Sequence, residues 1–285
     1  MSYHPTGLPE NLSKLNRTLV MGVLNATPDS FSDGGKFSSS ASAISYGLDL
    51  ARSGADIVDV GGESTRPGAE RVTLEEELER TIPIVSALAN EGICVSIDTM
   101  RAAVAREAIA AGAAIVNDVS GGLADVEMYG VIAQFTVPYI LMHWRGHSDQ
   151  MMNQADYQDV VAEVAHELSG QITLANEAGI ASDRIVIDPG IGFAKLPEDN
   201  WKLLRQLSEI KDLGHPILVG ASRKRFIGEL LADNGVDRDV LEREAATTAI
   251  TTFLAQTDTW AVRVHDVRAS ADAIAVVQKL GESDE

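Results

Sequence analysis

The stretch Leu19-Val-Met-Gly-Val-Leu-Asn25 carries the pattern on which the fold rests, a short apolar run that ends in a polar side chain. Apolar character along the run is nearly continuous, which is typical of a parallel strand covered on both faces. Similar runs follow at residues 56–60, 93–97, 114–116, 138–142, 184–187, 216–219 and 261–264. With residues 19–24 as the first run, the sequence predicts eight parallel strands.

Segments with helical spacing separate these runs, because their apolar residues recur every three or four positions. They cover residues 40–53, 74–89, 102–111, 157–178, 200–212 and 271–280, with an extra helix at about 244–254. Eight strands alternating with helical segments predict an α/β fold, a single (β/α)8 TIM barrel. An open, doubly wound sheet is the competing topology, although no glycine-rich dinucleotide motif follows the first run.

The chain divides into a flexible leader at residues 1–17, a barrel domain at 18–281 and an acidic tail at 282–285. A charged insertion at residues 231–243 has no assigned role and is interpreted as a solvated loop. The net charge of −19 argues against binding to nucleic acid, whose phosphates would be repelled. The sequence contains no run of 18 apolar residues, so it predicts no membrane-spanning helix. Its single cysteine, Cys94, excludes a disulfide framework. We therefore expect a cytoplasmic protein.

Polar side chains end nearly every run, and in a barrel the carboxyl ends of the strands form one functional rim. An aspartate after a strand is usually a turn former or helix cap, but a whole ring of polar residues is harder to explain in this way. Asp98, Asn117 and Asp188 could together accept hydrogen bonds from a flat heterocycle with amidine-like N–H groups. Met142 and Phe193 could form apolar walls, although core packing is the favoured interpretation of Met142 taken alone.

Basic side chains reach the same rim, which suggests an anionic substrate or leaving group in an otherwise acidic chain. Lys224, Arg263 and His265 follow or end the last two runs, and Ser222 adds a hydroxyl. Two loops, residues 27–35 and 61–68, are rich in Gly, Pro and Ser and could act as lids over this face. Phe31 could cover the site, although ordinary connecting loops are the alternative interpretation.

Several motifs resemble those of the dihydropteroate synthases. They are Met21-Gly-Val-Leu-Asn-Ala-Thr-Pro-Asp-Ser-Phe-Ser-Asp-Gly-Gly35, Val58-Asp-Val-Gly-Gly-Glu-Ser-Thr-Arg-Pro-Gly68, Ser96-Ile-Asp-Thr99, Asn117-Asp-Val-Ser-Gly121, Asp188-Pro-Gly-Ile-Gly-Phe193, Ser222-Arg-Lys224 and Arg263-Val-His265. The resemblance covers residues 20–277, and Met142-His-Trp-Arg145 resembles the actinobacterial branch. Ala194 stands where the family commonly has Gly.

This resemblance implies a transferase of folate synthesis that joins 6-hydroxymethyl-7,8-dihydropterin diphosphate to p-aminobenzoate, giving 7,8-dihydropteroate and diphosphate. It implies three groups of site residues: Asp98, Asn117, Met142, Asp188, Phe193 and Lys224 for the pterin, Asn25, Thr65, Arg263 and His265 for diphosphate, and Phe31, Thr65, Arg66, Pro67, Phe193 and Ser222 for p-aminobenzoate. Asp98, Asp188 and Lys224 would serve catalysis, and Asn25 would ligate Mg²⁺. The resemblance also implies a homodimer and competition by sulfonamides.

Two other functions remain open. Methyltetrahydrofolate-type methyltransferases share the pterin contacts but have no need for Asn25, Arg263 and His265. A non-catalytic pterin-binding paralogue would be expected to have lost a loop or a basic residue, and neither loss is seen in the sequence.

Overall fold

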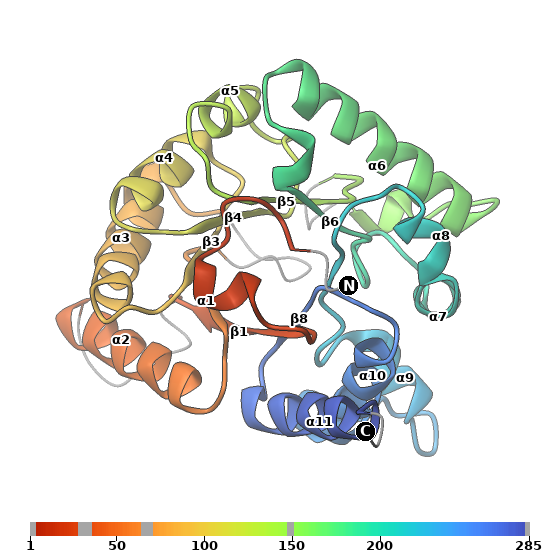
Figure 1. Ribbon diagram of the computed structural model, residues 1–285. Helices are drawn as coiled ribbons and strands as arrows, with labels where there is room; N and C mark the ends of the chain where they lie inside the picture. Colours follow the sequence, from red (N-terminus) through yellow and green to blue (C-terminus); the bar gives the residue numbers. More distant parts are fainter. Residues whose placement is uncertain (1–3, 28–35, 64–70, 147–150, 283–285) are drawn as a thin grey trace.

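The computed structural model describes residues 4–27, 36–63, 71–146 and 151–282, and in this part of the chain eight parallel strands form a barrel (Figure 1). The strands are β1 Leu19–Asn25, β2 Ile57–Gly61, β3 Val95–Asp98, β4 Ile115–Asp118, β5 Tyr139–Met142, β6 Ile185–Asp188, β7 Leu218–Val219 and β8 Ala261–Val264. Their order is β6-β5-β4-β3-β2-β1-β8-β7. A parallel bridge between Ile187 and Ile217 joins the two outer strands. The predicted closed barrel is therefore confirmed, and the open sheet is excluded.

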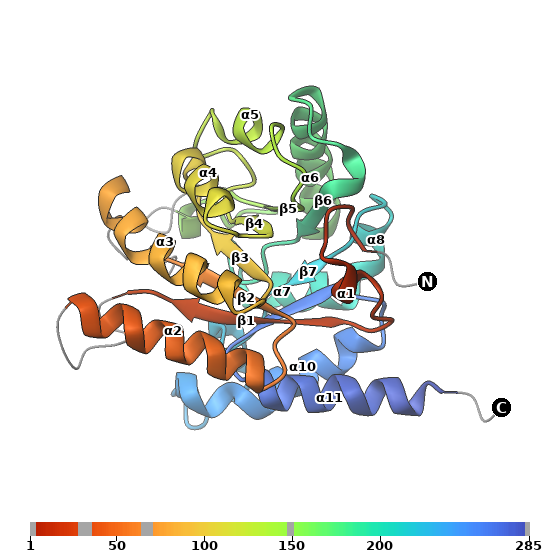
Figure 2. The ribbon, with the colours of Figure 1, turned by 60° about the vertical axis from the view of Figure 1, so that its left-hand side comes forward.

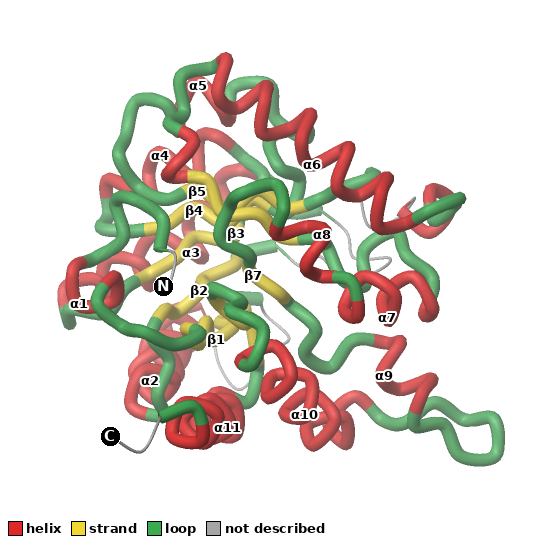
Figure 3. Tube along the Cα trace, turned by 45° about the vertical axis from the view of Figure 1, so that its right-hand side comes forward, coloured by secondary structure: helices red, strands yellow, loops and turns green. Residues whose placement is uncertain are grey.

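Helices surround the strands on every side (Figures 1 and 3). They are α1 Glu10–Ser13, α2 Lys36–Arg52, α3 Leu74–Asn90, α4 Ala102–Ala110, α5 Met128–Ile132, α6 Val160–Glu177, α7 Pro197–Arg205, α8 Leu207–Lys211, α9 Arg225–Leu230, α10 Glu244–Ala255 and α11 Val267–Leu280. All seven segments expected from periodicity are helical, with the segment at 200–212 divided between α7 and α8. Among the described residues, no helix combines the length and apolar character needed to span a bilayer.

Alternate side chains of each strand face the inside and the outside of the barrel. Leu19, Met21 and Ile57 belong to the buried interior cluster, whereas Val20 and Leu24 pack in the layer between strands and helices. Towards the carboxyl ends of the strands the interior becomes polar. The near-continuous apolar runs thus arise because both faces of the lower strand segments are buried.

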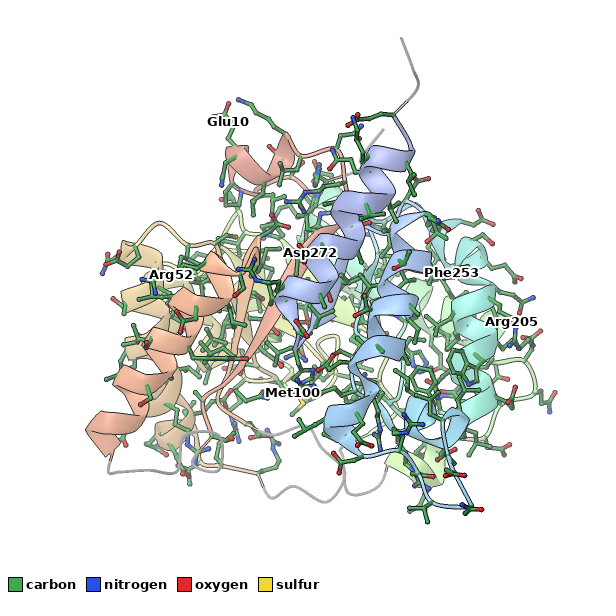
Figure 4. The ribbon with its side chains drawn as sticks, turned by 90° about the horizontal axis from the view of Figure 1, so that it is seen from below. Glu10, Arg52, Met100, Arg205, Phe253 and Asp272 are labelled. Atoms are coloured by element: carbon green, nitrogen blue, oxygen red, sulfur yellow. The ribbon has the colours of Figure 1, made fainter. Side chains whose placement is uncertain are left out.

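The amino-terminal leader differs from the expectation of a flexible segment. Leu8 and Leu12 are buried against the interior cluster of the barrel, and α1 lies across the end at which β1 begins (Figure 2). His4 accepts a hydrogen bond from the Trp260 indole and also contacts the Leu15 carbonyl. In Figure 4, Glu10 of α1 and Met100, which follows β3, lie toward opposite ends of the molecule. The described part of the leader therefore closes the barrel opposite the polar rim.

Strand register places several polar residues at one level. Asn25 of β1 is aligned with Gly61 of β2, Gly61 with Asp98 of β3, and Asp98 with Asn117 of β4. Residues aligned across neighbouring strands present their side chains on the same face. Asn25, Asp98 and Asn117 therefore share one row of the barrel, and Gly61 adds no side chain between them.

Ala194 has a left-handed backbone, with φ of 46°. This conformation costs an L-residue about 1–2 kcal/mol but costs glycine almost nothing. This difference explains why glycine is common at this position in the family.

We expect Ala194→Gly to be neutral or stabilising, because relief of the left-handed strain offsets the lost methyl group and the added unfolded-state entropy. Ala181→Gly is the control, since Ala181 is exposed with φ of −65°, and it should lose about 0.5–1 kcal/mol. Urea unfolding measures both changes, and an equal loss in the two variants would contradict the strain.

Candidate active site

A group of charged side chains fills the barrel interior at the carboxyl ends of β2, β3, β4 and β8. Arg263 Nε donates to Asp59 Oδ2 at 2.6 Å, and its Nη2 donates to Asp98 Oδ2 at 2.7 Å. Asn117 Nδ2 donates to the same Asp59 oxygen at 3.0 Å. Two carboxylates thus share one guanidinium, and Asn117 reaches the cluster through its amide NH2 group.

Asp59 is a residue of this cluster that the sequence interpretation missed. Its side chain is fully buried, and its Oδ1 has no hydrogen-bond partner among the described residues. Asp59 lies two positions before Gly61 and so faces the barrel interior with it. An aspartate inside the apolar run 56–60 was the available signal, because a buried charge at such a position requires a partner.

Asp98 has an altered acidity. Burial raises its pKa from the ordinary 3.8 to about 7, Arg263 opposes this rise, and the carboxylate of Asp59 adds to it. Between these two pKa values, Asp98 keeps its proton in the folded state, whereas in the unfolded chain it has already lost that proton.

This difference predicts a pH dependence of stability. Between pH 4 and 7 the folded state binds more protons at Asp98 than the unfolded state, so stability should fall as pH rises through this window. We expect Asp98→Asn to reduce the downward slope, by at most about 1.4 kcal/mol per pH unit. Urea unfolding at several pH values measures the slope, and an unchanged slope in the variant would contradict the raised pKa.

Asp188 and Lys224 form a second charged pair, on which Arg263 also acts. Asp188 ends β6 and accepts a hydrogen bond from the Gly190 amide at 2.7 Å. Burial raises the pKa of Asp188, whereas Lys224 opposes the rise. For Lys224 the direction is reversed: burial lowers its pKa to about 7 and the Asp188 carboxylate opposes that shift. The two groups thus partly compensate the burial of each other's charge.

Phe193 and Gly192 shape the space around Lys224. The Lys224 ammonium lies 4.2 Å from the centroid of the Phe193 ring and donates to the Ile191 carbonyl. A Cβ on Gly192 would come within 2.4 Å of Lys224 Cδ, and Gly192 has φ of 79°. Glycine is therefore needed here both for its backbone conformation and for the approach of the lysine. Met142 is buried in β5 and is aligned with Asp188 in the strand register.

Ser222, which follows β7, and His265, which follows β8, are hydrogen-bonded to each other. His265 Nδ1 and Ser222 Oγ are 2.9 Å apart, and the His265 amide donates to the same hydroxyl at 3.2 Å. Ser222, assigned by resemblance to p-aminobenzoate, is therefore in direct contact with His265, assigned by resemblance to diphosphate.

The insertion at residues 231–243 supports the turn that carries Ser222 and Lys224. Between them Arg223 has a left-handed φ of 62°, and its carbonyl accepts a hydrogen bond from Arg243 Nη1 at 2.9 Å. Arg243 is buried, ends the short 3-10 helix Val240–Arg243, and donates from Nε to the Arg238 carbonyl at 2.8 Å. Residues 232–240 are exposed and extend away from the barrel beyond α9 (Figure 3). The solvated-loop interpretation thus fits the middle of the insertion but not its end.

A second charged network holds the described ends of the loop after β2. Arg101 donates to Glu63 at 2.8 Å, contacts the buried Glu77, and donates to the Val72 carbonyl at 2.6 Å. Thr99 donates to Glu77 at 2.6 Å. Arg101 was not singled out in the sequence, because its partners are distant in the chain.

The described residues therefore bring together most, but not all, of the predicted site. Arg263 contacts Asp98 and shares Asp59 with Asn117, and its charge also acts on Asp188 and Lys224. Lys224 lies against the Phe193 ring, Met142 is aligned with Asp188, and Ser222 contacts His265. Asn25 lies half-buried at the end of β1 in the same row as Asp98. Phe31, Thr65, Arg66 and Pro67 lie outside the described residues.

Comparison with known proteins identifies the family of the chain. A family model described as "Pterin binding enzyme" matches residues 21–265. Dihydropteroate synthase of Mycobacterium leprae is 52% identical over 260 residues, which cover 90% of this chain and 92% of that protein. The Synechocystis dihydropteroate synthase is 49% identical over 282 residues, covering 98% and 96%.

Solved structures agree in fold as well as in sequence. A Xanthomonas albilineans dihydropteroate synthase with 4-aminobenzoic acid superposes with a TM-score of 0.87 at 43% identity, covering 94% of this chain and 95% of that one. A Yersinia pestis dihydropteroate synthase in a sulfonamide complex gives 0.87 at 37% identity, covering 98% and 99%. The chain thus belongs to the dihydropteroate synthases, within the pterin-binding enzyme family.

Proposed function

We propose that this chain condenses 6-hydroxymethyl-7,8-dihydropterin diphosphate with p-aminobenzoate, forming 7,8-dihydropteroate and diphosphate. The observation that carries the proposal is the convergence of acceptor groups from β2, β3, β4 and β6 with Lys224 and Arg263 in one barrel interior. A solved relative from Xanthomonas albilineans holds 7,8-dihydropteroate, which supports the same assignment.

Pterin binding is assigned to Asp98, Asn117, Asp188 and Lys224. Carboxylate and amide oxygens can accept the N–H donors of the pterin edge, while the lysine can donate to an acceptor on the ring. A negative carboxylate beside the ring also stabilises positive charge that develops on the exocyclic methylene as the leaving group departs. Met142 and Phe193 supply apolar contact to the flat ring.

In the reaction the methylene–oxygen bond to diphosphate breaks, a carbon–nitrogen bond forms, and the attacking amine loses a proton. An aromatic amine is already neutral at cellular pH, so the chain needs no strong general base. We assign Ser222 and Phe193 to the p-aminobenzoate side, together with Phe31, Thr65, Arg66 and Pro67 from outside the described residues. Sulfonamides are expected to compete there, since a related synthase was solved with such a drug.

Diphosphate is assigned to Asn25, Arg263 and His265, with Thr65 as a further ligand outside the described residues. Arg263 is bonded to Asp98 and Asp59, so diphosphate must compete with a carboxylate for part of this guanidinium. Guanidinium groups bind phosphate oxygens well because their planar N–H donors match that geometry.

A magnesium ion fits the same position. Mg²⁺ prefers oxygen ligands and is usually held by one or two protein groups together with substrate phosphates. Asn25 offers an amide oxygen at the rim, and the described residues contain no cluster of three His, Cys, Asp or Glu that could hold a metal without substrate. When bound, the ion would neutralise part of the charge on the departing diphosphate. We further propose that the protein is a cytoplasmic homodimer. Analytical ultracentrifugation would test the dimer.

The test of the proposed function is diphosphate release measured with and without p-aminobenzoate at a fixed concentration of the pterin substrate. Release that depends on the amine supports the synthase. Tight pterin binding without release would instead indicate a non-catalytic paralogue. The absence of both pterin binding and diphosphate release would overturn the proposal.

A further inference from the structure

Lys195 is a buried lysine that the proposed reaction leaves without a role. It follows the β6 loop and is only 4% exposed. Its Nζ lies 3.0 Å from the Phe193 carbonyl oxygen and 3.0 Å from His143 Nδ1. Within the described ranges it forms no ion pair with a carboxylate. Burial lowers its pKa to about 7, with Asp188 opposing the shift. Burying an amine with only neutral acceptors is costly, so its retention calls for a reason.

His143 connects this lysine to a charged surface network. The imidazole is fully buried, and its Nε2 lies 2.9 Å from Glu167 Oε2. Glu167 also accepts from Arg145 at 3.1 Å, and Arg145 lies 3.9 Å from the centre of the Tyr157 ring. A charged lysine at this distance donates to Nδ1, which places the ring proton of a neutral imidazole on Nε2, where it points to Glu167.

The loop that carries Asp188 and Phe193 packs directly against this chain of contacts. A Cβ on Gly190 would lie 2.5 Å from the His143 carbonyl oxygen. Left-handed backbone occurs at Gly190, Gly192 and Ala194, so the loop turns sharply three times. Such a loop is held in place by its contacts rather than by regular secondary structure. The Lys195 bond to the Phe193 carbonyl is one of these contacts.

We propose that Lys195, oriented by His143 and Glu167, is a positioning residue that fixes the Phe193 ring beside Lys224. The inference deepens the proposed function and rests on it, because Phe193 is assigned to the p-aminobenzoate side of the site. Lys195 touches no substrate and acts through the backbone of Phe193. Residues that orient a ligand-binding group typically change affinity or turnover by about 10–100-fold when they are removed.

The test compares Lys195→Met with Lys202→Met. Lys202 is a partly exposed lysine on α7 that pairs with the exposed Asp159, so its replacement removes a positive charge without touching the loop. We expect Lys195→Met to lower kcat/KM for p-aminobenzoate about 10–100-fold. The affinity for a pterin analogue should fall by a smaller factor, because Phe193 is only one of several groups assigned to the pterin. Lys202→Met should match the unchanged chain in both measurements.

A spectroscopic readout separates positioning from general destabilisation. The ¹⁵N chemical shifts of the His143 imidazole can be assigned because these signals are missing in His143→Gln. They should report protonation at Nε2 in the unchanged chain and a different tautomer population in Lys195→Met. If Lys195→Met does not fold, Lys195→Gln takes its place with the same expectations. Unchanged amine kinetics, or unchanged imidazole shifts, would overturn the inference. Absence of amine-dependent activity in the unchanged chain would instead refute the proposed function, while the shifts still test the contact.

Discussion

Replacement of Lys224 by Met is expected to lower kcat/KM by about a thousandfold while leaving the fold intact. Lys224 is the ammonium group that faces both Asp188 and the Phe193 ring in the pocket. Loss of one preorganised donor at a reacting centre typically costs a factor of about 10²–10³. The loss should be spread over pterin binding and turnover, because the donor is needed in the ground state and in the transition state.

Stability should suffer less than in an Arg263 variant, because burial disfavours the charged lysine and methionine fills a similar volume, while Lys195 and Arg263 still act on the Asp188 carboxylate. Arg225→Met is the matched control. Arg225 is the next residue, its side chain is 79% exposed, and it pairs with Glu229 on the surface of α9. Steady-state kinetics of the two variants decide the matter, and near-normal rates for Lys224→Met would remove this residue from the site.

Replacement of Arg263 by Met is expected to abolish measurable turnover and to destabilise the fold by about 3–5 kcal/mol. Arg263 is bonded to two buried carboxylates, Asp59 and Asp98. Removing it leaves both without a cation, so each carboxyl group must stay charged without a partner or take up a proton. Either outcome costs more stability than most single substitutions. Arg268→Met, at an exposed position of α11, is the control and should be neutral.

A second substitution separates the two consequences. In the Arg263→Met background, Asp98→Asn removes one of the uncompensated charges and should restore part of the lost stability, without restoring turnover. Urea unfolding and steady-state rates report the two effects independently. Additive losses of stability in the double variant would show that the two residues are not coupled.

The fold was predictable because the strands are short apolar runs whose two faces are both buried. The runs at 19–24 and 261–264 coincide with β1 and β8 almost residue for residue. Shorter or less regular elements were not predictable in this way. Helix α5 has only five residues, too few for helical periodicity to appear. The leader appeared loose because its two buried leucines, Leu8 and Leu12, stand among polar residues.

The site was predictable where polar residues end a strand, because barrel topology alone brings such ends together. Asp98, Asn117 and Asp188 are of this kind. Asp59 was missed since it lies inside an apolar run, one layer below the rim. Lys195 was missed for a different reason: its contact with His143 joins residues 52 positions apart on different loops. Contacts of this kind depend on the packing of loops, which strand periodicity does not report.

The most direct test of the central claim is a crystal structure of the chain with a non-hydrolysable analogue of the pterin diphosphate. We expect the pterin ring inside the barrel, with its N–H edge on Asp98, Asn117 and Asp188 and with Lys224 within hydrogen-bond distance of the ring. The diphosphate should lie toward Arg263 and His265. A ring bound elsewhere, with Arg263 still holding Asp98 and the interior filled by water, would contradict the account.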